Sequence, residues 1–129
     1  MAEPRLLDAS QPAESWFVGP DALDLIFGAN VLHITPFAVT EGLVAGALRS
    51  LRPGGRLVLY GPFAMHGVLE PESNQNFDAS LRARDPAWGV RDVDDLLRLG
   101  EPGGLVLETV EDMPANNKML FFKKGPALA

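Results

Sequence analysis

The stretch LDLIFGANVLHITPFAVTEGLVAGALRSLRPGGRLVLYGPF, residues 23–63, decides the fold. It begins with the apolar run LDLIFGA, whose length and β-favouring residues indicate a strand buried on both faces. It ends with RLVLY, residues 56–60, a second strand that Gly61 and Pro62 terminate. A strand, a helix and a second strand in one sheet almost always form a right-handed parallel crossover. The stretch therefore predicts the centre of an open α/β sheet.

The residues between the two strands predict a helix that packs on the sheet. Thr35 suits the N-cap position and Pro36 the first helical position. Apolar and small side chains then recur at helical spacing on one face, and RPGG at residues 52–55 ends the helix. That face consists of Phe37, Thr40, Leu43, Val44, Ala47, Leu48 and Leu51.

Two further strands follow near the end of the chain. GLVLETVEDM (residues 104–113) and KMLFFKK (residues 118–124) are joined by PANN, whose turn chemistry predicts an antiparallel hairpin. A short helix, VDDLLRL, precedes them, and Asp92 can cap it. The expected fold class is therefore α/β, a single domain over residues 1–129 in which parallel strands with helices end in a C-terminal antiparallel hairpin.

A polar segment, SNQNFDASLRARDPAWGVRD (residues 73–92), separates the second strand from this short helix. It combines bulky aromatic residues with charges of both signs, which is compatible with a structural clasp or with part of a ligand pocket. Exposed ion pairs contribute only about 0–1 kcal/mol each, so a clasp alone is an inefficient use of these charges. The segment follows a parallel strand and should pass over the carboxyl end of the sheet, where open α/β sheets bind ligands. Both interpretations stay open.

Composition argues against several classes of function. With 17 acidic and 11 basic residues the formal net charge is -6, which disfavours binding to a phosphate backbone. The chain has no cysteine, which excludes disulfides and thiolate chemistry, and the spacing of its two histidines predicts no metal site. We expect neither a secretory signal nor a membrane span. The expected protein is intracellular, most simply cytoplasmic, and binds neither nucleic acid nor membranes.

Four stretches of the chain together resemble the methyltransferase-like protein 26 family. They are ANVLHITPF (residues 29–37), LRPGGRLVLYGPF (51–63), the polar segment (73–92) and MPANN (113–117). The order of the elements is also similar to the C-terminal half of the class I S-adenosylmethionine-dependent methyltransferase fold, whose last strands form a reversed hairpin. The resemblance implies a Rossmann-like sheet, S-adenosylmethionine as the cofactor of the family, and an unknown substrate.

The sequence lacks the glycine-rich turn that approaches the cofactor in such methyltransferases. The resemblance therefore implies an N-terminally truncated form without the first two strands of the sheet, and an incomplete cofactor site. RLLDA, residues 5–9, would correspond to the third strand of that sheet, with Asp8 near the adenine. The strand along Leu25 to Ala29 would be an exposed edge, open to association with a second copy or another protein.

Asn30 and His33 follow the first predicted strand and are candidates for cofactor binding and for catalysis, respectively. Ligands of open α/β sheets bind beyond the carboxyl ends of the strands, which is where both residues should lie. His33 can act as a general base or orient a substrate, because imidazole titrates near neutrality. The alternative is a histidine whose ring is satisfied by the backbone at the helix entry.

Asn74, Arg82 and Asn116 are candidates for substrate binding, and Arg82 is also a catalytic candidate. A guanidinium donates two hydrogen bonds at once and so suits a carboxylate or phosphate. The alternative for Arg82 is the structural clasp, and Asn116 most simply forms the hairpin turn. In that clasp the arginines pair with aspartates of the same segment, namely Arg82, Arg84 and Arg91 with Asp78, Asp85 and Asp92.

These patterns predict a methyltransferase-like protein with an incomplete cofactor site and an unknown substrate. None of the usual nucleophile motifs is present, and methyl transfer needs none, because its cofactor supplies the electrophile. The alternative is a non-enzymatic short isoform or interaction module that pairs through the exposed strand edge.

Overall fold

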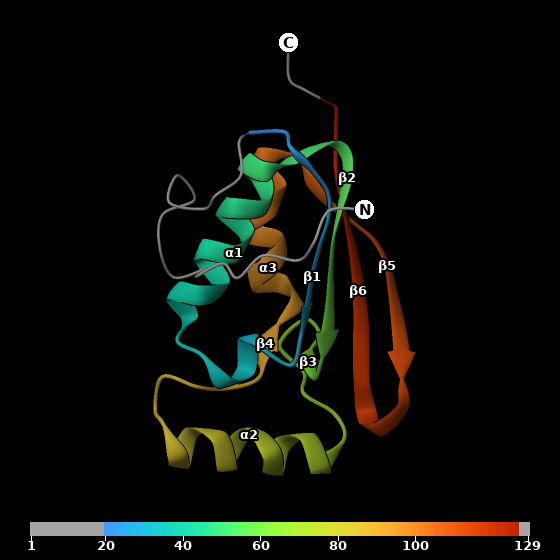
Figure 1. Ribbon diagram of the computed structural model, residues 1–129. Coiled ribbons are helices and arrows are strands. Elements are labelled where there is room, and N and C mark those ends of the chain that lie inside the picture. The colour runs from blue at the N-terminus through green and yellow to red at the C-terminus, as the bar shows by residue number, and fades with distance from the viewer. Residues whose placement is uncertain (1–19, 127–129) are drawn as a thin grey trace.

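A computed structural model describes residues 20–126, which form a four-stranded mixed sheet with helices on one face (Figure 1). The strands lie in the order β1-β2-β6-β5. β1 (Leu23–Ala29) runs parallel to β2 (Leu51–Gly61). β6 (Asn117–Lys124) runs antiparallel both to β2 and to β5 (Leu105–Met113). The predicted α/β class, the parallel pair and the C-terminal hairpin are confirmed.

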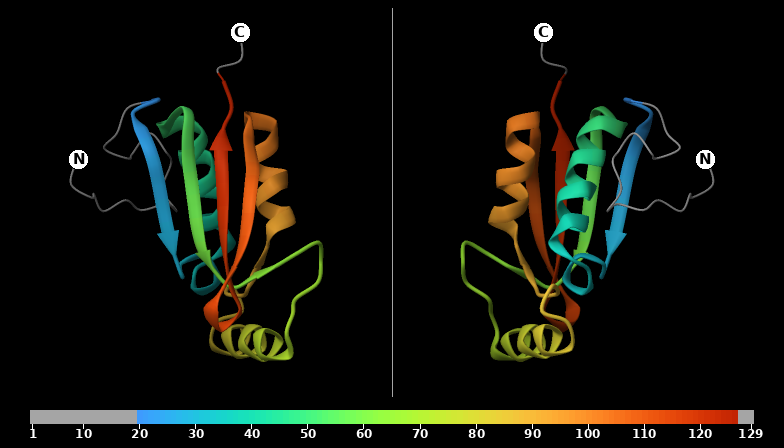
Figure 2. Two further views of the ribbon diagram at one scale, coloured as in Figure 1. Left: turned by 90° about the vertical axis from the view of Figure 1, so that its right-hand side faces the viewer. Right: turned by 90° about the vertical axis from the view of Figure 1, so that its left-hand side faces the viewer.

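Two helices cover one face of this sheet. α1 (Phe37–Ser50) and α3 (Val93–Gly100) lie next to each other on the same side of the strands, as Figure 2 shows. Burying the apolar side chains of both layers gives the fold its single core. The sheet residues under the helices are no more than 2% exposed, and they include Leu57, Leu59, Leu120 and Phe122.

The start of α3 confirms the predicted cap. Asp92 Oδ1 accepts a hydrogen bond from the backbone N–H of Asp94 at 2.8 Å, which satisfies one of the free donors of the first turn. Its Oδ2 accepts a second bond from the N–H of Gly67 at 2.6 Å. The helix ends at Gly100, and the turn η3 (Glu101–Gly103) leads into β5. Asp92 therefore fixes both the helix start and the loop before it.

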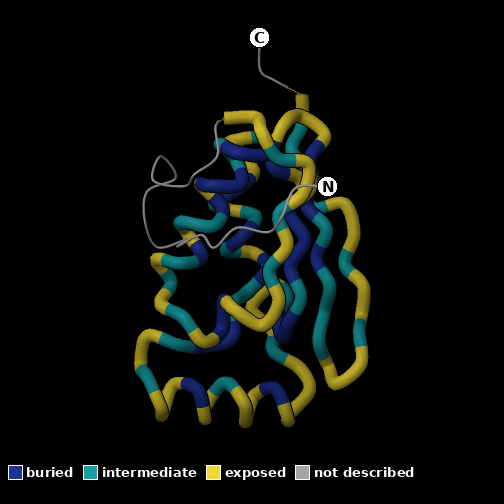
Figure 3. The backbone as a smooth tube through the Cα atoms, viewed as in Figure 1, coloured by how far each residue is buried: buried dark blue, intermediate teal, exposed yellow. Residues whose placement is uncertain are grey.

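The prediction that LDLIFGA is buried on both faces is wrong. Leu25 and Phe27 of β1 are 56% and 57% exposed, and Val106 of β5 is 55% exposed. Figure 3 shows exposed stretches along both of these outer strands. The physical reason is that α1 and α3 cover one face only, and no other element within residues 20–126 covers the opposite face (Figures 1 and 2). β1 is also an edge strand in this part of the chain, as the family resemblance implied for Leu25 to Ala29.

The connections around α1 differ from the expected ones. Thr35 does not cap the helix, because its hydroxyl donates backward to the carbonyl of Val31 at 2.9 Å across the turn η2 (Leu32–Ile34). Pro36 occupies the N-cap position, without a side-chain hydrogen bond. β2 begins directly at the end of α1, at Leu51, and includes the RPGG residues that were expected to end the helix.

The polar segment of residues 73–92 is not irregular throughout, because most of it forms α2 (Glu72–Arg84). This helix lies across the end of the sheet to which β1 and β2 point (Figures 1 and 2). Periodicity did not reveal it, since its buried residues are only Asn74 and Leu81. Two short strands, β3 (Phe63–Ala64) before the helix and β4 (Arg91–Asp92) after it, pair with each other in parallel.

Candidate functional site

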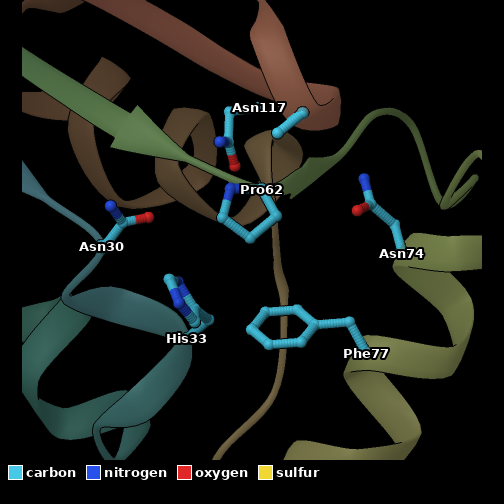
Figure 4. A pocket seen from close by; sticks show the side chains of 7 residues that line it. Asn30, His33, Pro62, Asn74, Phe77 and Asn117 are labelled. Atoms are coloured by element: carbon cyan, nitrogen blue, oxygen red, sulfur yellow. The ribbon is translucent and has the colours of Figure 1, made fainter.

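A pocket of about 210 Å³ lies between the carboxyl ends of β1 and β2, the helix α2 and the β5–β6 turn (Figure 4). Three of the residues that the sequence predicts for a site, Asn30, His33 and Asn74, line it together. Each comes from a different element, so the fold rather than the local sequence brings them together. The other lining residues are Pro62, Phe77, Ala115 and Asn117.

His33 occupies one wall of the pocket and is 7% exposed. Its ring meets the ring of Phe77 edge to face, with the centroids 5.5 Å apart. Burial lowers the pKa of His33 from its ordinary value, and the positive charge of Arg91 lowers it further. The imidazole is therefore neutral near pH 7, with one ring nitrogen free to accept a proton or a hydrogen bond.

The loop after α2 holds the turn that carries His33. Arg91 donates from Nε to the carbonyl of Leu32 at 3.2 Å and from Nη2 to the carbonyl of Thr35 at 2.7 Å. The backbone N–H of Gly89 donates to the carbonyl of His33 itself at 3.0 Å. These bonds fix the backbone on both sides of the imidazole. Arg91 thus acts on His33 through the neighbouring backbone. The clasp interpretation expected Arg91 to pair with an aspartate, and the structure shows it bonded to carbonyls.

Arg82 lies outside the pocket lining. Its Nε donates to both carboxylate oxygens of Asp78 at 3.1 Å, and Asp78 Oδ1 also accepts from the N–H of Val90 at 2.8 Å. The guanidinium packs against Gly89, where an added Cβ would lie 2.6 Å from Nη2. In this structure Arg82 therefore ties α2 to the following loop, which matches the clasp interpretation.

The remaining charges of the segment bond in other ways. Arg84 lies over the ring of Trp88, 5.5 Å from its centroid, an arrangement favourable for a cation and an aromatic face. Asp85 accepts a hydrogen bond from the N–H of Ala87 at 2.9 Å, and Asp92 caps α3. The segment is thus a clasp in its second half and a pocket wall in its first half.

Asn74 reaches into the pocket from α2 and is 7% exposed. Its Nδ2 donates to the carbonyls of Glu70 and Asn116, both at 3.1 Å. Because carbonyls can only accept, these bonds fix the orientation of the amide and leave Oδ1 pointing into the pocket (Figure 4). Asn116 contributes its backbone only, since its own side chain donates to Ser73 Oγ at 3.4 Å and is not part of the pocket lining.

Asn117 at the start of β6 is oriented in the same way. Its Nδ2 donates to the carbonyl of Pro114 at 3.3 Å and to Tyr60 Oη at 3.1 Å, so its Oδ1 faces the pocket (Figure 4). Asn30 lies opposite, with a backbone φ of 55°, a left-handed conformation that asparagine tolerates well. In the described part of the chain no side-chain partner holds Asn30, and its oxygen also points inward in Figure 4.

Sequence reasoning placed Pro62 and Phe77 near this rim but missed Ala115. Ala115 lies in the turn η4 (Pro114–Asn116) with a φ of 61°, and nothing in its residue type marks it as a wall of a pocket. PANN was expected to form the hairpin turn, and the structure adds the amide of Asn117 to the pocket. Ala115 and Asn116 both have a left-handed backbone, and this turn brings the amide of Asn117 to Tyr60 of β2. The sequence PANN alone does not specify this geometry.

The residues of this pocket do not by themselves fit S-adenosylmethionine, the cofactor that the sequence resemblance implies. No acidic side chain lines the pocket to accept bonds from ribose hydroxyls. Its volume, about 210 Å³, is below the roughly 300–1,000 Å³ of sites that enclose drug-sized ligands. Asp8 and the RLLDA stretch, predicted to lie near the adenine, fall outside the described residues. The described part of the chain therefore offers a site for a smaller group.

Two further properties concern the part of the chain that the structure describes. Residues 20–126 bring together no group of three or more His, Cys, Asp or Glu side chains that could hold a metal ion. Within the same residues, no helix combines the length and the hydropathy of a membrane span.

Comparison of the sequence with known proteins identifies a family and two partial relatives. A family model described as "Protein of unknown function (DUF938)" matches residues 1–124. The chain is 36% identical over 87 residues to "Highly reducing polyketide synthase 2" of Gibberella zeae, which covers 67% of the chain and 3% of the synthase. It is 34% identical over 58 residues to "Highly reducing polyketide synthase PKS6" of the same species, 45% of the chain and 2% of that synthase. The chain thus spans only a few per cent of these curated relatives.

Solved methyltransferases share the fold at low sequence identity. An O-methyltransferase family protein from Burkholderia thailandensis superposes with a TM-score of 0.73 at 13% identity, covering 92% of this chain and 35% of that one. Human N-acetylserotonin methyltransferase in complex with SAM superposes with a TM-score of 0.67 at 17% sequence identity. The match covers 79% of this chain and 29% of that one. A putative methyltransferase from Bacillus halodurans superposes with a TM-score of 0.62 at 15% sequence identity. The match covers 91% of this chain and 76% of that one. The described sheet and helices therefore have a class I methyltransferase fold.

Proposed function

The chain belongs to the DUF938 family of proteins of unknown function, and we propose that it is a methyltransferase-like protein whose described residues form the acceptor side of a methyl-transfer site. The observation that carries this proposal is His33, an imidazole with a lowered pKa in a pocket at the carboxyl end of a methyltransferase-like sheet. Ligand sites of open α/β folds lie at this end of the strands. The pocket is also small enough to select a single acceptor group.

His33 serves as the general base in this proposal. An O–H or N–H group that gains a methyl group must lose a proton, and a neutral imidazole within hydrogen-bond reach can accept it. Arg91 and Gly89 hold the backbone of the His33 turn, while Phe77 packs against the ring. Arg82 has no part in this chemistry, because Asp78 engages it away from the pocket.

The cofactor part of the site is proposed to be incomplete in this chain. The proposal includes membership of the methyltransferase-like protein 26 family and the absence of the first two strands of its sheet. Two observations support it: β1 is an edge strand within residues 20–126, and the pocket has no acidic residue for a ribose. S-adenosylmethionine, when bound in such proteins, supplies the electrophilic methyl group.

Two measurements test this proposal. An NMR pH titration of the full chain should give His33 a pKa below the ordinary value of about 6.5, with His33→Gln identifying the signal. A measured pKa at or above the ordinary one would contradict the role of His33 as general base. Calorimetric titration with S-adenosylmethionine should show no micromolar binding. Micromolar affinity would contradict the incomplete cofactor site and leave the role of His33 intact.

The outer edge of β1 favours a second candidate function, association with a second copy of the chain. The N–H of Asn30 donates to the carbonyl of Tyr60 at 2.8 Å, so the even-numbered residues of β1 direct their backbone groups toward β2. By alternation Leu25 and Phe27 direct theirs away from the sheet, where no described residue pairs with them. An apolar unpaired edge is a template for another strand.

Two copies of β1 match each other in an antiparallel arrangement centred on Ile26. Leu25 of one copy then lies opposite Phe27 of the other, an apolar pair whose free backbone groups also meet. Asp24 lies opposite Gly28, so no like charges face each other. Ile26 lies opposite itself in a pair without hydrogen bonds. This arrangement joins the two sheets and covers both exposed edges.

Cross-linking tests the association directly, because the chain has no cysteine of its own. An Ile26→Cys variant should form a covalent dimer on mild oxidation, since opposed Cα atoms in such a pair lie about 4.5 Å apart and disulfides span about 4.4–6.8 Å. Light scattering should show a dimer of the unmodified chain. Ala45→Cys, on the exposed side of α1, is the control and should form no covalent dimer on oxidation. A stable monomer without cross-linking contradicts the association.

A further inference from the structure

The pocket presents an unusual excess of hydrogen-bond acceptors. The amide oxygens of Asn30, Asn74 and Asn117 all point toward its interior (Figure 4). We infer that the pocket selects an uncharged planar group that donates hydrogen bonds from N–H, such as a primary carboxamide carried on a single ring. The inference rests on the proposed function, since it names the chemical class of the acceptor substrate.

The orientation of two of these oxygens follows from the hydrogen-bond network. The Nδ2 atoms of Asn74 and Asn117 donate to backbone carbonyls, which cannot donate in return. Turning either amide over would place oxygen against oxygen, so Oδ1 must face the pocket. A ligand that fills the pocket must donate to these oxygens or leave them without a partner, at a cost of about 1–3 kcal/mol for the buried Asn74 and less for the half-buried Asn117.

Charge excludes anionic ligands from this pocket. No lysine or arginine lines it, and Arg82, the cation predicted to read a carboxylate, is engaged with Asp78. A carboxylate or phosphate would therefore place its oxygens against the amide oxygens with no cation to compensate. An ammonium group is also disfavoured, because the guanidinium of Arg91 lies directly behind the His33 turn, 2.7 Å from the carbonyl of Thr35. A neutral donor remains.

Size and shape limit the ligand to one ring. A cavity of about 150 Å³ in another protein holds benzene, and this pocket measures about 210 Å³. The ring of Phe77 and the side chain of Pro62 form apolar walls between the amides (Figure 4). A substituted six-membered ring therefore fits, with its face on the apolar walls and its N–H donors toward the amide oxygens.

The experiment compares benzamide with benzoate, two molecules of the same shape that differ in donors and charge. The full chain, labelled with ¹⁵N, is titrated with each, and the side-chain NH₂ signals of Asn74 and Asn117 are followed. We expect millimolar binding of benzamide, typical of so small a ligand, and at least about tenfold weaker binding of benzoate. Equal or tighter binding of benzoate overturns the inference, and so does the absence of benzamide binding up to its solubility.

Variants of Asn30 test the role of the oxygens without disturbing the fold. Asn30→Gly keeps the left-handed backbone but removes one acceptor, and should weaken benzamide binding about three- to tenfold. Asn30→Asp keeps an oxygen at the same place and should retain the binding. Asn116→Gly is the matched control, because Asn116 has a φ of 60° and a side chain outside the pocket lining. An equal loss of benzamide affinity in Asn30→Gly and Asn116→Gly would contradict the inference.

Failure of this inference is distinguishable from failure of the proposed function. Benzamide binding requires neither cofactor nor proton transfer, so it is measured independently of S-adenosylmethionine. If benzamide binds while His33 titrates at its ordinary pKa, the acceptor pocket stands and the general base does not. If His33 titrates low while benzoate binds better, the base stands and the class of acceptor is wrong.

Discussion

The two faces of the sheet differ sharply in what covers them. On one face, Leu57, Leu59 and Leu120 lie under α1 and α3 with at most 2% of their surface exposed. On the other, Leu25 and Phe27 are more than half exposed. Both faces carry aliphatic and aromatic side chains, so composition does not distinguish them. The difference indicates that the covered face supplies most of the stability of the described residues, while the other, bare face has no covering layer within residues 20–126.

Two adjacent phenylalanines in β6 test the difference between the two faces most directly, with the largest expected effect on stability. Phe122 lies on the covered face and is 1% exposed, whereas Phe121 lies on the bare face and is only partly buried. We expect Phe122→Ala to lower the free energy of unfolding by about 3–5 kcal/mol, because it leaves a cavity in the core. Phe121→Ala should cost less than half of that. Urea unfolding followed by tryptophan fluorescence measures both, and equal losses would show that the bare face is also covered.

Sequence periodicity predicted those parts of the fold whose signals are local. LDLIFGA, RLVLY and the hairpin around PANN were recognised from runs of β-favouring residues with turn residues between them, and Asp92 was recognised as a cap. The bare face could not be predicted in this way. A strand with apolar residues on both faces has the same sequence whether a second layer covers it or not.

The helix α2 and the full set of pocket residues also escaped prediction. The sequence of α2 has no apolar stripe, because it packs through Asn74 and Leu81 at the end of the sheet. Asn30, His33 and Asn74 were selected as residues at strand ends and in the polar segment, and the structure places them in one pocket. Arg82 was selected by its chemistry alone, and only the geometry shows that Asp78 engages it. Long-range packing decided each of these cases.

A polar group within the covered face offers a second test. The hydroxyl of Thr40 on α1 is fully buried without a hydrogen-bond partner. Thr40→Val has nearly the same shape and removes this unsatisfied group, so we expect a gain of up to about 1 kcal/mol in unfolding free energy. Thr35→Val is the control with the opposite sign, because the hydroxyl of Thr35 donates to Val31. A loss of stability in Thr40→Val would show that this hydroxyl has a partner in solution.

The pocket at the end of the sheet also carries a pH dependence of stability. The pKa of His33 is lowered by burial and by Arg91, so the unfolded chain takes up a proton at this residue more readily than the folded chain. The contribution of His33 to stability is complete above the unfolded value of about 6.5 and is lost as the pH falls through the lower folded value. Unfolding midpoints of the wild type should fall over this range. His33→Gln should show a shallower slope, and an unchanged slope would contradict the lowered pKa.

The smallest effect on stability is expected on the bare edge. Phe27→Lys replaces an exposed side chain of β1, so the free energy of unfolding at low protein concentration should change by no more than about 0.5 kcal/mol. The same substitution should abolish self-association, because a lysine on an edge strand opposes pairing with another strand. Light scattering at high concentration and urea unfolding at low concentration separate the two effects. A loss of more than about 2 kcal/mol would mean that Phe27 is packed within the monomer, and the contrast between the two faces would then disappear.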